Sequence, residues 1–146
     1  MRTLGIDLGQ RRVGLALSDA EGKFATPSKV LEVRSADAAI RPILELIAQE
    51  AVGRAVIGLP LNMDGTTGPA AKATVAWGRQ LASRSAVEVL FVDERLSSFE
   101  AEQQLVARKK AGEKLTRGRK KQRLDALAAA GFLQAFLDGR IAAIEV

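Results

Sequence analysis

Apolar residues recur at every second position near the start of the chain, a spacing that predicts β-strands. One such stretch covers residues 4–9 and a second covers residues 13–17, so the residues between them form a tight hairpin turn. A third strand is predicted over residues 28–33, with Pro27 at its start, where a missing amide does least harm. Three consecutive strands before any helix predict an antiparallel meander.

Helical and strand patterns alternate along the next part of the chain. Residues 54–59 and 87–92 are predicted strands, and residues 40–51 form a predicted helix with Pro42 in or near its first turn. A second helix is predicted to begin near Pro69, with Thr66 or Thr67 as its cap. The face predicted for this second helix contains Ala70, Ala73, Thr74, Trp77 and Leu81.

Two more helices complete the predicted fold. Ser97 and Glu100 have the spacing of a capping box, which opens a third helix, and a long last helix is predicted from about residue 120 to residue 137. Gly139 ends it. The expected architecture is one α/β domain over residues 1–146, with helices on both faces of a mixed sheet: an antiparallel three-strand meander plus two parallel strands.

Composition then limits the chemistry. The 146 residues contain no cysteine, histidine or tyrosine, which excludes disulfides, thiolate zinc sites and the usual general base, and leaves carboxylates with metal ions for hydrolysis. Met1 leads directly into the first strand without a secretory signal pattern, and the most apolar stretch is shorter than the roughly 18 residues that suggest a membrane span. A cytoplasmic protein without a membrane partner is expected.

Positive charge is concentrated in one segment. The whole chain carries a net charge of +5. Residues 108–123 contain nine basic residues and one acid, whereas the rest of the chain has 13 basic and 16 acidic residues. A solvated loop is the common fate of such a run. Because it directly precedes Asp125, we interpret this basic segment as a binding surface for the backbone of a nucleic acid.

Acidic residues at three places are candidates for the chemistry. Asp7 lies near a strand end among small residues, which leaves room for a cation, although it could equally cap the hairpin turn. Asp93 and Glu94 follow the fifth strand, point to opposite faces, and strand alternation does not choose between them. The acid that does not join Asp7 is expected to stabilise its turn with Arg95.

Asp125 has a charge that conflicts with its position. At helical spacing it shares an apolar face with Ala128, Ala129, Phe132 and Phe136, so its carboxylate needs a hydrogen-bond network, a basic partner or a metal ion. Lys121 and Arg123 are nearby alternatives, and an acid in the first turn of a helix also suits the helix dipole. We favour a metal ion because two other acids at strand ends are available to share it.

Three segments of the chain occur in the order of a known family: Gly5-Ile6-Asp7-Leu8-Gly9 with Arg12-Val13-Gly14, then Gly58-Leu59-Pro60-Leu61-Asn62-Met63-Asp64-Gly65, then Asp93-Glu94-Arg95-Leu96-Ser97. They resemble the YqgF family, also called RuvX. The resemblance implies an RNase H-like fold and a nuclease that resolves Holliday junctions or matures the 5′ end of pre-16S ribosomal RNA. It also implies Asp7, one of Asp93 and Glu94, and Asp125 as catalytic acids.

The expected function is therefore two-metal hydrolysis of phosphodiester bonds, with Mg²⁺ or Mn²⁺ ions about 4 Å apart as cofactors. The expected metal ligands are Asp7, Glu94 and Asp125, and the substrate is structured RNA or a four-way DNA junction, bound by a monomer or a homodimer. The candidate nucleic-acid contacts are Arg12, Asn62, Arg95, Lys109, Lys110, Arg119, Lys120 and Lys121. Two alternatives remain, a non-catalytic nucleic-acid-binding module of this fold and an actin- or hexokinase-like phosphotransferase.

Overall fold

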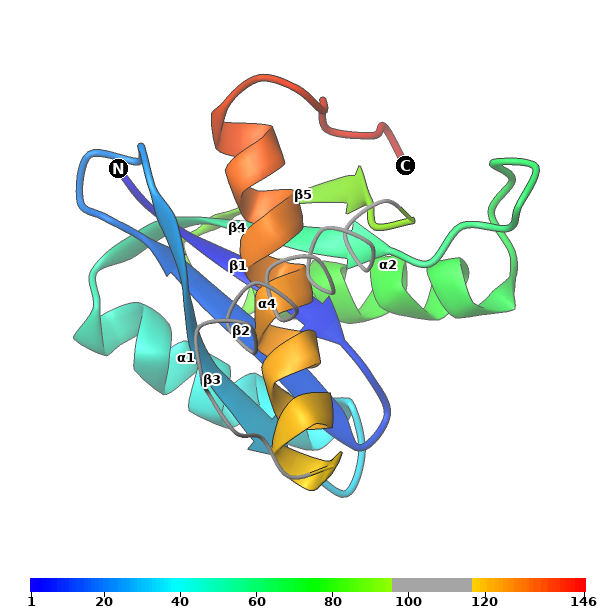
Figure 1. Ribbon diagram of the computed structural model, residues 1–146, viewed down its shortest axis with the longest axis horizontal. Helices are drawn as coiled ribbons and strands as arrows, with labels where there is room; N and C mark the ends of the chain where they lie inside the picture. Colours follow the sequence, from blue (N-terminus) through cyan, green and yellow to red (C-terminus); the bar gives the residue numbers. More distant parts are fainter. Residues whose placement is uncertain (96–116) are drawn as a thin grey trace.

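The computed structural model describes residues 1–95 and 117–146, with side chains at residues 1–95 and 125–146. Five strands form one sheet in the order β3-β2-β1-β4-β5 (Figure 1). The strands are β1 (Arg2–Leu8), β2 (Arg12–Ser18), β3 (Ala25–Glu32), β4 (Val52–Leu59) and β5 (Glu88–Asp93). The first three are antiparallel, and β4 and β5 run parallel to β1, as predicted.

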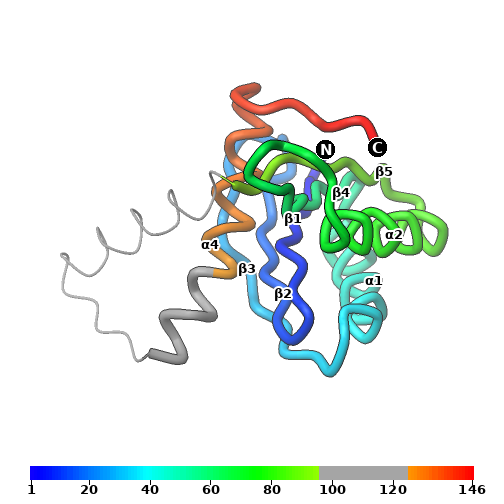
Figure 2. The backbone as a smooth tube through the Cα atoms, turned by 90° about the vertical axis from the view of Figure 1, so that its right-hand side faces the viewer, coloured from blue at the N-terminus to red at the C-terminus, as the bar shows by residue number. Residues whose placement is uncertain are grey.

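Helices cover both faces of this sheet, which confirms the predicted architecture. Helices α1 (Ile40–Gln49) and α2 (Pro69–Ser83) lie on one face, and α4 (Arg117–Leu137) crosses the other (Figure 2). The strands divide their side chains between these layers. Leu4 and Ile6 of β1 belong to the core beneath α1 and α2, whereas Ala16, Val56 and Val92 pack with α4.

Several boundaries differ from the prediction. Strand β3 begins at Ala25 instead of residue 28, so Pro27 lies inside it, which an edge strand tolerates. Neither Thr66 nor Thr67 caps α2: Gly68 precedes the helix without a side-chain cap, although Pro69 does occupy the first turn. On the predicted face of α2, Thr74, Trp77 and Leu81 are buried, but Ala70 and Ala73 are exposed.

The last helix also begins earlier than predicted. It starts at Arg117, so Gly118 lies within its first turn and Asp125 lies eight residues further on, in the third turn. The helix dipole therefore does not explain an acid at position 125. The predicted C-terminus is confirmed, because Gly139 has a φ of 75° and the amide of Arg140 donates to the carbonyl of Ala135.

Some predictions fall outside the described residues. The capping box of Ser97 and Glu100, the helix that follows it, and the part of the basic segment before Arg117 belong to residues 96–116. Of the helices that the structure does describe, none is both long enough and apolar enough to cross a membrane.

Candidate acidic site at the end of the parallel strands

Asp7 lies near the C-terminal end of β1, on the face of the sheet that α4 covers. Its partner across the hairpin is Gly14, and this glycine lets α4 approach closely. A Cβ at position 14 would lie 2.1 Å from the backbone oxygen of Asp125, and a Cβ on Gly5 would lie 3.0 Å from that of Ala129. Small residues on β1 and β2 thus bring the helix acid to the strand acid.

Glu94 reaches the same place from the far side of β4. Strand β4 separates β5 from β1, and the side chain of Glu94 passes over Gly58, where a Cβ would lie 2.8 Å from its Oε2 atom. A side-chain hydrogen bond joins Glu94 to Asp7. The missing side chain of Gly58 in β4 therefore leaves the space in which the acids at the ends of β1 and β5 meet.

Asp93 lies on the other face, as expected for the next residue along a strand. It pairs with Leu59, a core residue beneath α1 and α2, and its carboxylate accepts hydrogen bonds from the side chain and the amide of Arg95, the shortest from Nη2 at 2.6 Å. This contact lowers the pKa of Asp93. The acid that does not join Asp7 thus forms the predicted ion pair with Arg95.

Burial and mutual repulsion leave one proton between Asp7 and Glu94 at neutral pH. Burial raises the pKa of Asp7 to about 6, and the negative charge of Asp125 adds to the rise. Burial together with the charge of Asp7 raises the pKa of Glu94 to about 8. At pH 7 the Glu94 carboxyl therefore keeps its proton and donates it to the Asp7 carboxylate.

Asp125 has a basic partner that its position in the sequence did not suggest. The Nε atom of Arg12, at the start of β2, lies 3.4 Å from Oδ2 of Asp125, and both side chains are about one-third exposed. On the predicted face of α4, Ala128, Ala129 and Phe132 are buried and Phe136 is half-buried. Arg12, which is also a predicted contact to nucleic acid, is held against the helix acid.

The three acids suit a divalent cation in ligand type and in charge. Carboxylate oxygens are the ligands that Mg²⁺ and Mn²⁺ prefer, and among the side chains that the structure describes Arg12 forms an ion pair with one of the three acids. Within the described parts of the chain, however, no three acidic side chains converge closely enough to hold an ion. An ion would have to replace the proton of Glu94 and draw Asp125 away from Arg12.

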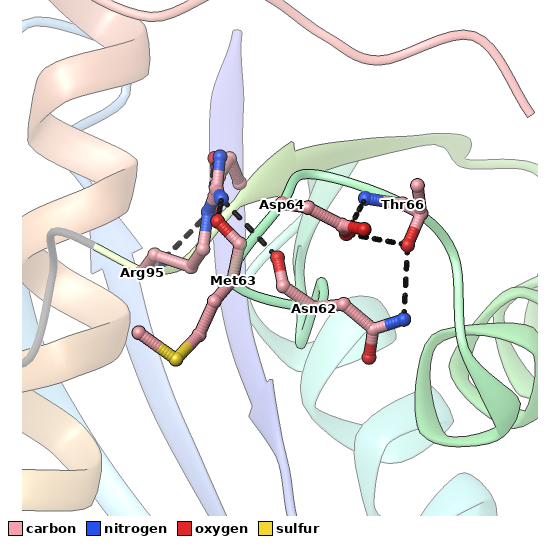
Figure 3. Close-up of polar contacts among 6 residues, drawn as sticks. Asn62, Met63, Asp64, Thr66 and Arg95 are labelled. Carbon is pink, nitrogen blue, oxygen red and sulfur yellow. Dashed lines mark hydrogen bonds and ion pairs between the residues drawn. The ribbon is translucent and has the colours of Figure 1, made fainter.

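The remaining candidate contacts to nucleic acid fall into two groups. Asn62 and Arg95 belong to a hydrogen-bonded loop beside the acids: Arg95 Nη1 donates to the carbonyl of Asn62 at 3.2 Å and to that of Met63 at 3.1 Å (Figure 3). Lys109 and Lys110 lie outside the described residues. Arg119, Lys120 and Lys121 are in the first turns of α4, but their side chains are not among those described.

Sequence reasoning missed Gly58 and the pairing of Arg12 with Asp125. The sequence placed Gly58 within a predicted strand and in a family segment without giving it a role, yet a glycine inside a buried strand often marks a close approach. That signal could have identified it. No comparable signal exists for Arg12, because its partner is more than 100 residues away in the chain.

Comparisons with known proteins agree on the relationship. The family described as "RuvX: Holliday junction resolvase" matches residues 1–139. Proteins named "Putative pre-16S rRNA nuclease" from Anaeromyxobacter sp. and Syntrophomonas wolfei are 45% and 40% identical, over 96% and 95% of this chain and 98% and 95% of their own. Thermus thermophilus RuvC, 19% identical, matches in fold with a TM-score of 0.61 over 99% of this chain and 100% of its own.

The fold comparison extends to a bound complex of the same enzyme. Thermus thermophilus RuvC in complex with Holliday junction substrate is 18% identical and has a TM-score of 0.59, covering 99% of both chains. At that identity the match establishes the RNase H-like fold. The match over residues 1–139 and the relatives at 40% identity and above establish the family, and the chain therefore belongs to the RuvX family of nucleases.

Proposed function

We propose that this chain is a metal-dependent endonuclease that hydrolyses phosphodiester bonds of structured nucleic acid, with Asp7, Glu94 and Asp125 as ligands of Mg²⁺ or Mn²⁺. The observation that carries the proposal is the hydrogen-bonded pair of Asp7 and Glu94, two half-buried carboxyl groups at the ends of the non-adjacent strands β1 and β5, with the charge of Asp125 nearby. A fold whose only purpose was binding phosphate would gain nothing from such a concentration of negative charge.

Each residue has a distinct task in this proposal. Asp7 and Glu94 hold their carboxylates together at the C-terminal ends of parallel strands, where ligands of such sheets gather. Asp125 completes the ligand set from α4, and Arg12 keeps its charge compensated until the ion arrives. When bound, the metal would activate water and stabilise the leaving oxygen, so no protein nucleophile is required.

Two substrates compete within the proposed function. The names of the relatives favour pre-16S ribosomal RNA, and the family description favours the Holliday junction. A resolvase makes two symmetric cuts and would act as a homodimer, whereas trimming of one RNA strand needs only a monomer. We propose the cytoplasm as the location, since both substrates are found there.

The decisive experiment offers both substrates to the purified protein. A synthetic four-way DNA junction and a precursor rRNA fragment are each incubated with Mg²⁺, with Mn²⁺ or with a chelator, beside an Asp7→Asn control. We expect cleavage of at least one substrate that stops in chelator and in the variant. If the folded protein binds both substrates but cleaves neither, the alternative of a non-catalytic binding module replaces this proposal.

A further inference from the structure

A large apolar side chain lies fully in solvent on the loop that Arg95 binds, and Arg95 is the residue that follows Glu94. Among the described residues the large apolar side chains that are more than half exposed are Met1, Phe24, Met63 and Val146. The first and last of these are chain ends, and Phe24 lies at the opposite end of β2 from the hairpin turn that follows Asp7. Met63 is 99% exposed, and its backbone carbonyl accepts a hydrogen bond from Arg95, the residue that follows Glu94.

The loop that presents Met63 is held in shape by its own hydrogen bonds. The amide of Asn62 donates to the carbonyl of Thr66 at 2.9 Å, and the amide of Gly65 donates back to the carbonyl of Asn62 at 2.8 Å. Asp64 accepts from both the amide and the hydroxyl of Thr66. The Met63 side chain points away from this network (Figure 3). Its exposure is thus a property of an ordered turn.

Arg95 connects this turn to the acids. Its guanidinium donates to the carbonyl of Met63 and, at its other edge, is bound by the carboxylate of Asp93. Arg95 directly follows Glu94, whose side chain is bonded to Asp7. A short chain of contacts therefore fixes the backbone of Met63 relative to the carboxylates, and it gives Asp93 a positioning task that differs from that of Glu94.

We propose that Met63 inserts between bases next to the phosphate held at the acidic site, and that Asp93 and Arg95 are positioning residues for this insertion. The inference rests on the proposed function. Apolar side chains that enter a base step unstack it and kink the duplex. A thioether on a flexible stem suits this role, because it is polarisable and adapts to the faces of different bases. The preferred ligand is nucleic acid with a weakened step, at a branch point or a bulge.

Base unstacking can be measured without cleavage. The probes are a four-way DNA junction and a precursor rRNA stem, each carrying 2-aminopurine at the branch point or beside the bulge, and both are studied in chelator. We expect wild type to raise the fluorescence on binding, Met63→Leu to retain most of the rise, and Met63→Ala to lose it at saturating protein. Phe24→Ala, which removes another exposed apolar side chain, should behave as wild type.

The rate of cleavage provides a second, independent measurement. On fully paired substrates Met63→Ala should be about 10-fold slower than wild type, and mismatches that unpair the step beside the cut should restore its rate. Arg95→Gln should resemble Met63→Ala in fluorescence. The insertion is overturned if Met63→Ala and wild type give equal fluorescence on both probes, or if wild type raises neither signal. Failure of wild type to cleave would overturn the proposed function alone, because the fluorescence reading needs no metal.

Discussion

Gly58 is the residue on which the meeting of the two strand acids depends. A methyl group there would lie within 2.9 Å of Glu94 and of the ring of Phe132, so Gly58→Ala should push Glu94 away from Asp7. We expect cleavage to fall by about 100-fold, the typical effect of misplacing a group by 1 Å, and stability to fall by about 1–3 kcal/mol through overpacking. Rates measured at saturating metal and chemical unfolding check both expectations.

Gly53 provides the matched control in the same strand. The three atoms nearest to a Cβ at position 53 all belong to the flexible side chain of Met1, so Gly53→Ala should leave the rate of cleavage intact. Equal rates for the two alanine variants would contradict the role assigned to Gly58.

Glu94 and Asp93 are adjacent in sequence and should separate sharply in function. Glu94→Gln removes the charge of a proposed metal ligand, and its effect on cleavage should exceed the roughly 100-fold loss that removal of an outer partner of a metal ligand causes. Asp93→Asn should keep manganese affinity near that of wild type, because this carboxylate binds Arg95 on the other face. Calorimetric titration with Mn²⁺ compares them, and a loss of affinity in Asp93→Asn would reverse the assignment.

At the scale of elements, the pattern of apolar residues predicted the strands and their order along the chain. The reason is that apolar residues either occupy every second position or run continuously in β1, β2 and β4. It could not choose between Asp93 and Glu94. The choice depends on the register of β5 against β4 and of β4 against β1, which is fixed by contacts between distant segments. The start of α4 was mispredicted because it also depends on contacts between distant segments. A glycine at position 118 reduces helix stability only slightly where the rest of the helix packs on a sheet.

The basic segment, residues 108–123, is the element expected to supply affinity. Replacing Lys109, Lys110, Lys120 and Lys121 by Gln should weaken binding to substrates of every sequence and reduce the slope of log affinity against log salt by up to about 4, roughly one for each phosphate that a lysine no longer neutralises. Salt titrations of binding measure this slope. The matched control replaces Lys23, Lys29 and Lys72, exposed lysines outside the segment, and should change it far less. Equal slopes for the two variants would contradict the prediction.

For the whole molecule, the raised pKa values make folding stability depend on pH in a defined direction. In the folded state the pKa of Asp7 is about 6 and that of Glu94 about 8, whereas in the unfolded chain these carboxyls have their ordinary pKa values of 3.8 and 4.5. The folded protein therefore keeps protons that the unfolded chain has already released. The contribution of these two groups to the free energy of unfolding is therefore fully present below pH 4 and is lost as the pH rises to about 8. Relative to wild type, Glu94→Gln should become more stable between pH 5 and pH 8 in denaturant titrations.

Divalent ions should act in the opposite direction on this site. Because a cation competes with the shared proton, Mn²⁺ should raise the melting temperature more at pH 8 than at pH 5. The Asp7→Asn variant should show little of this effect. A stabilisation by Mn²⁺ that is the same at both pH values would mean that the ion binds elsewhere.

The most direct test of the central claim counts the protons released when the ion binds. Calorimetric titration with Mn²⁺ at pH 7, repeated in buffers of different ionisation enthalpy, should give the release of about one proton per site, because the carboxyl of Glu94 must ionise to become a ligand. The release should vanish in Glu94→Gln and persist in Asp93→Asn. Binding without proton release, or equal release in Glu94→Gln and wild type, would contradict the assignment of Asp7 and Glu94 as the metal site.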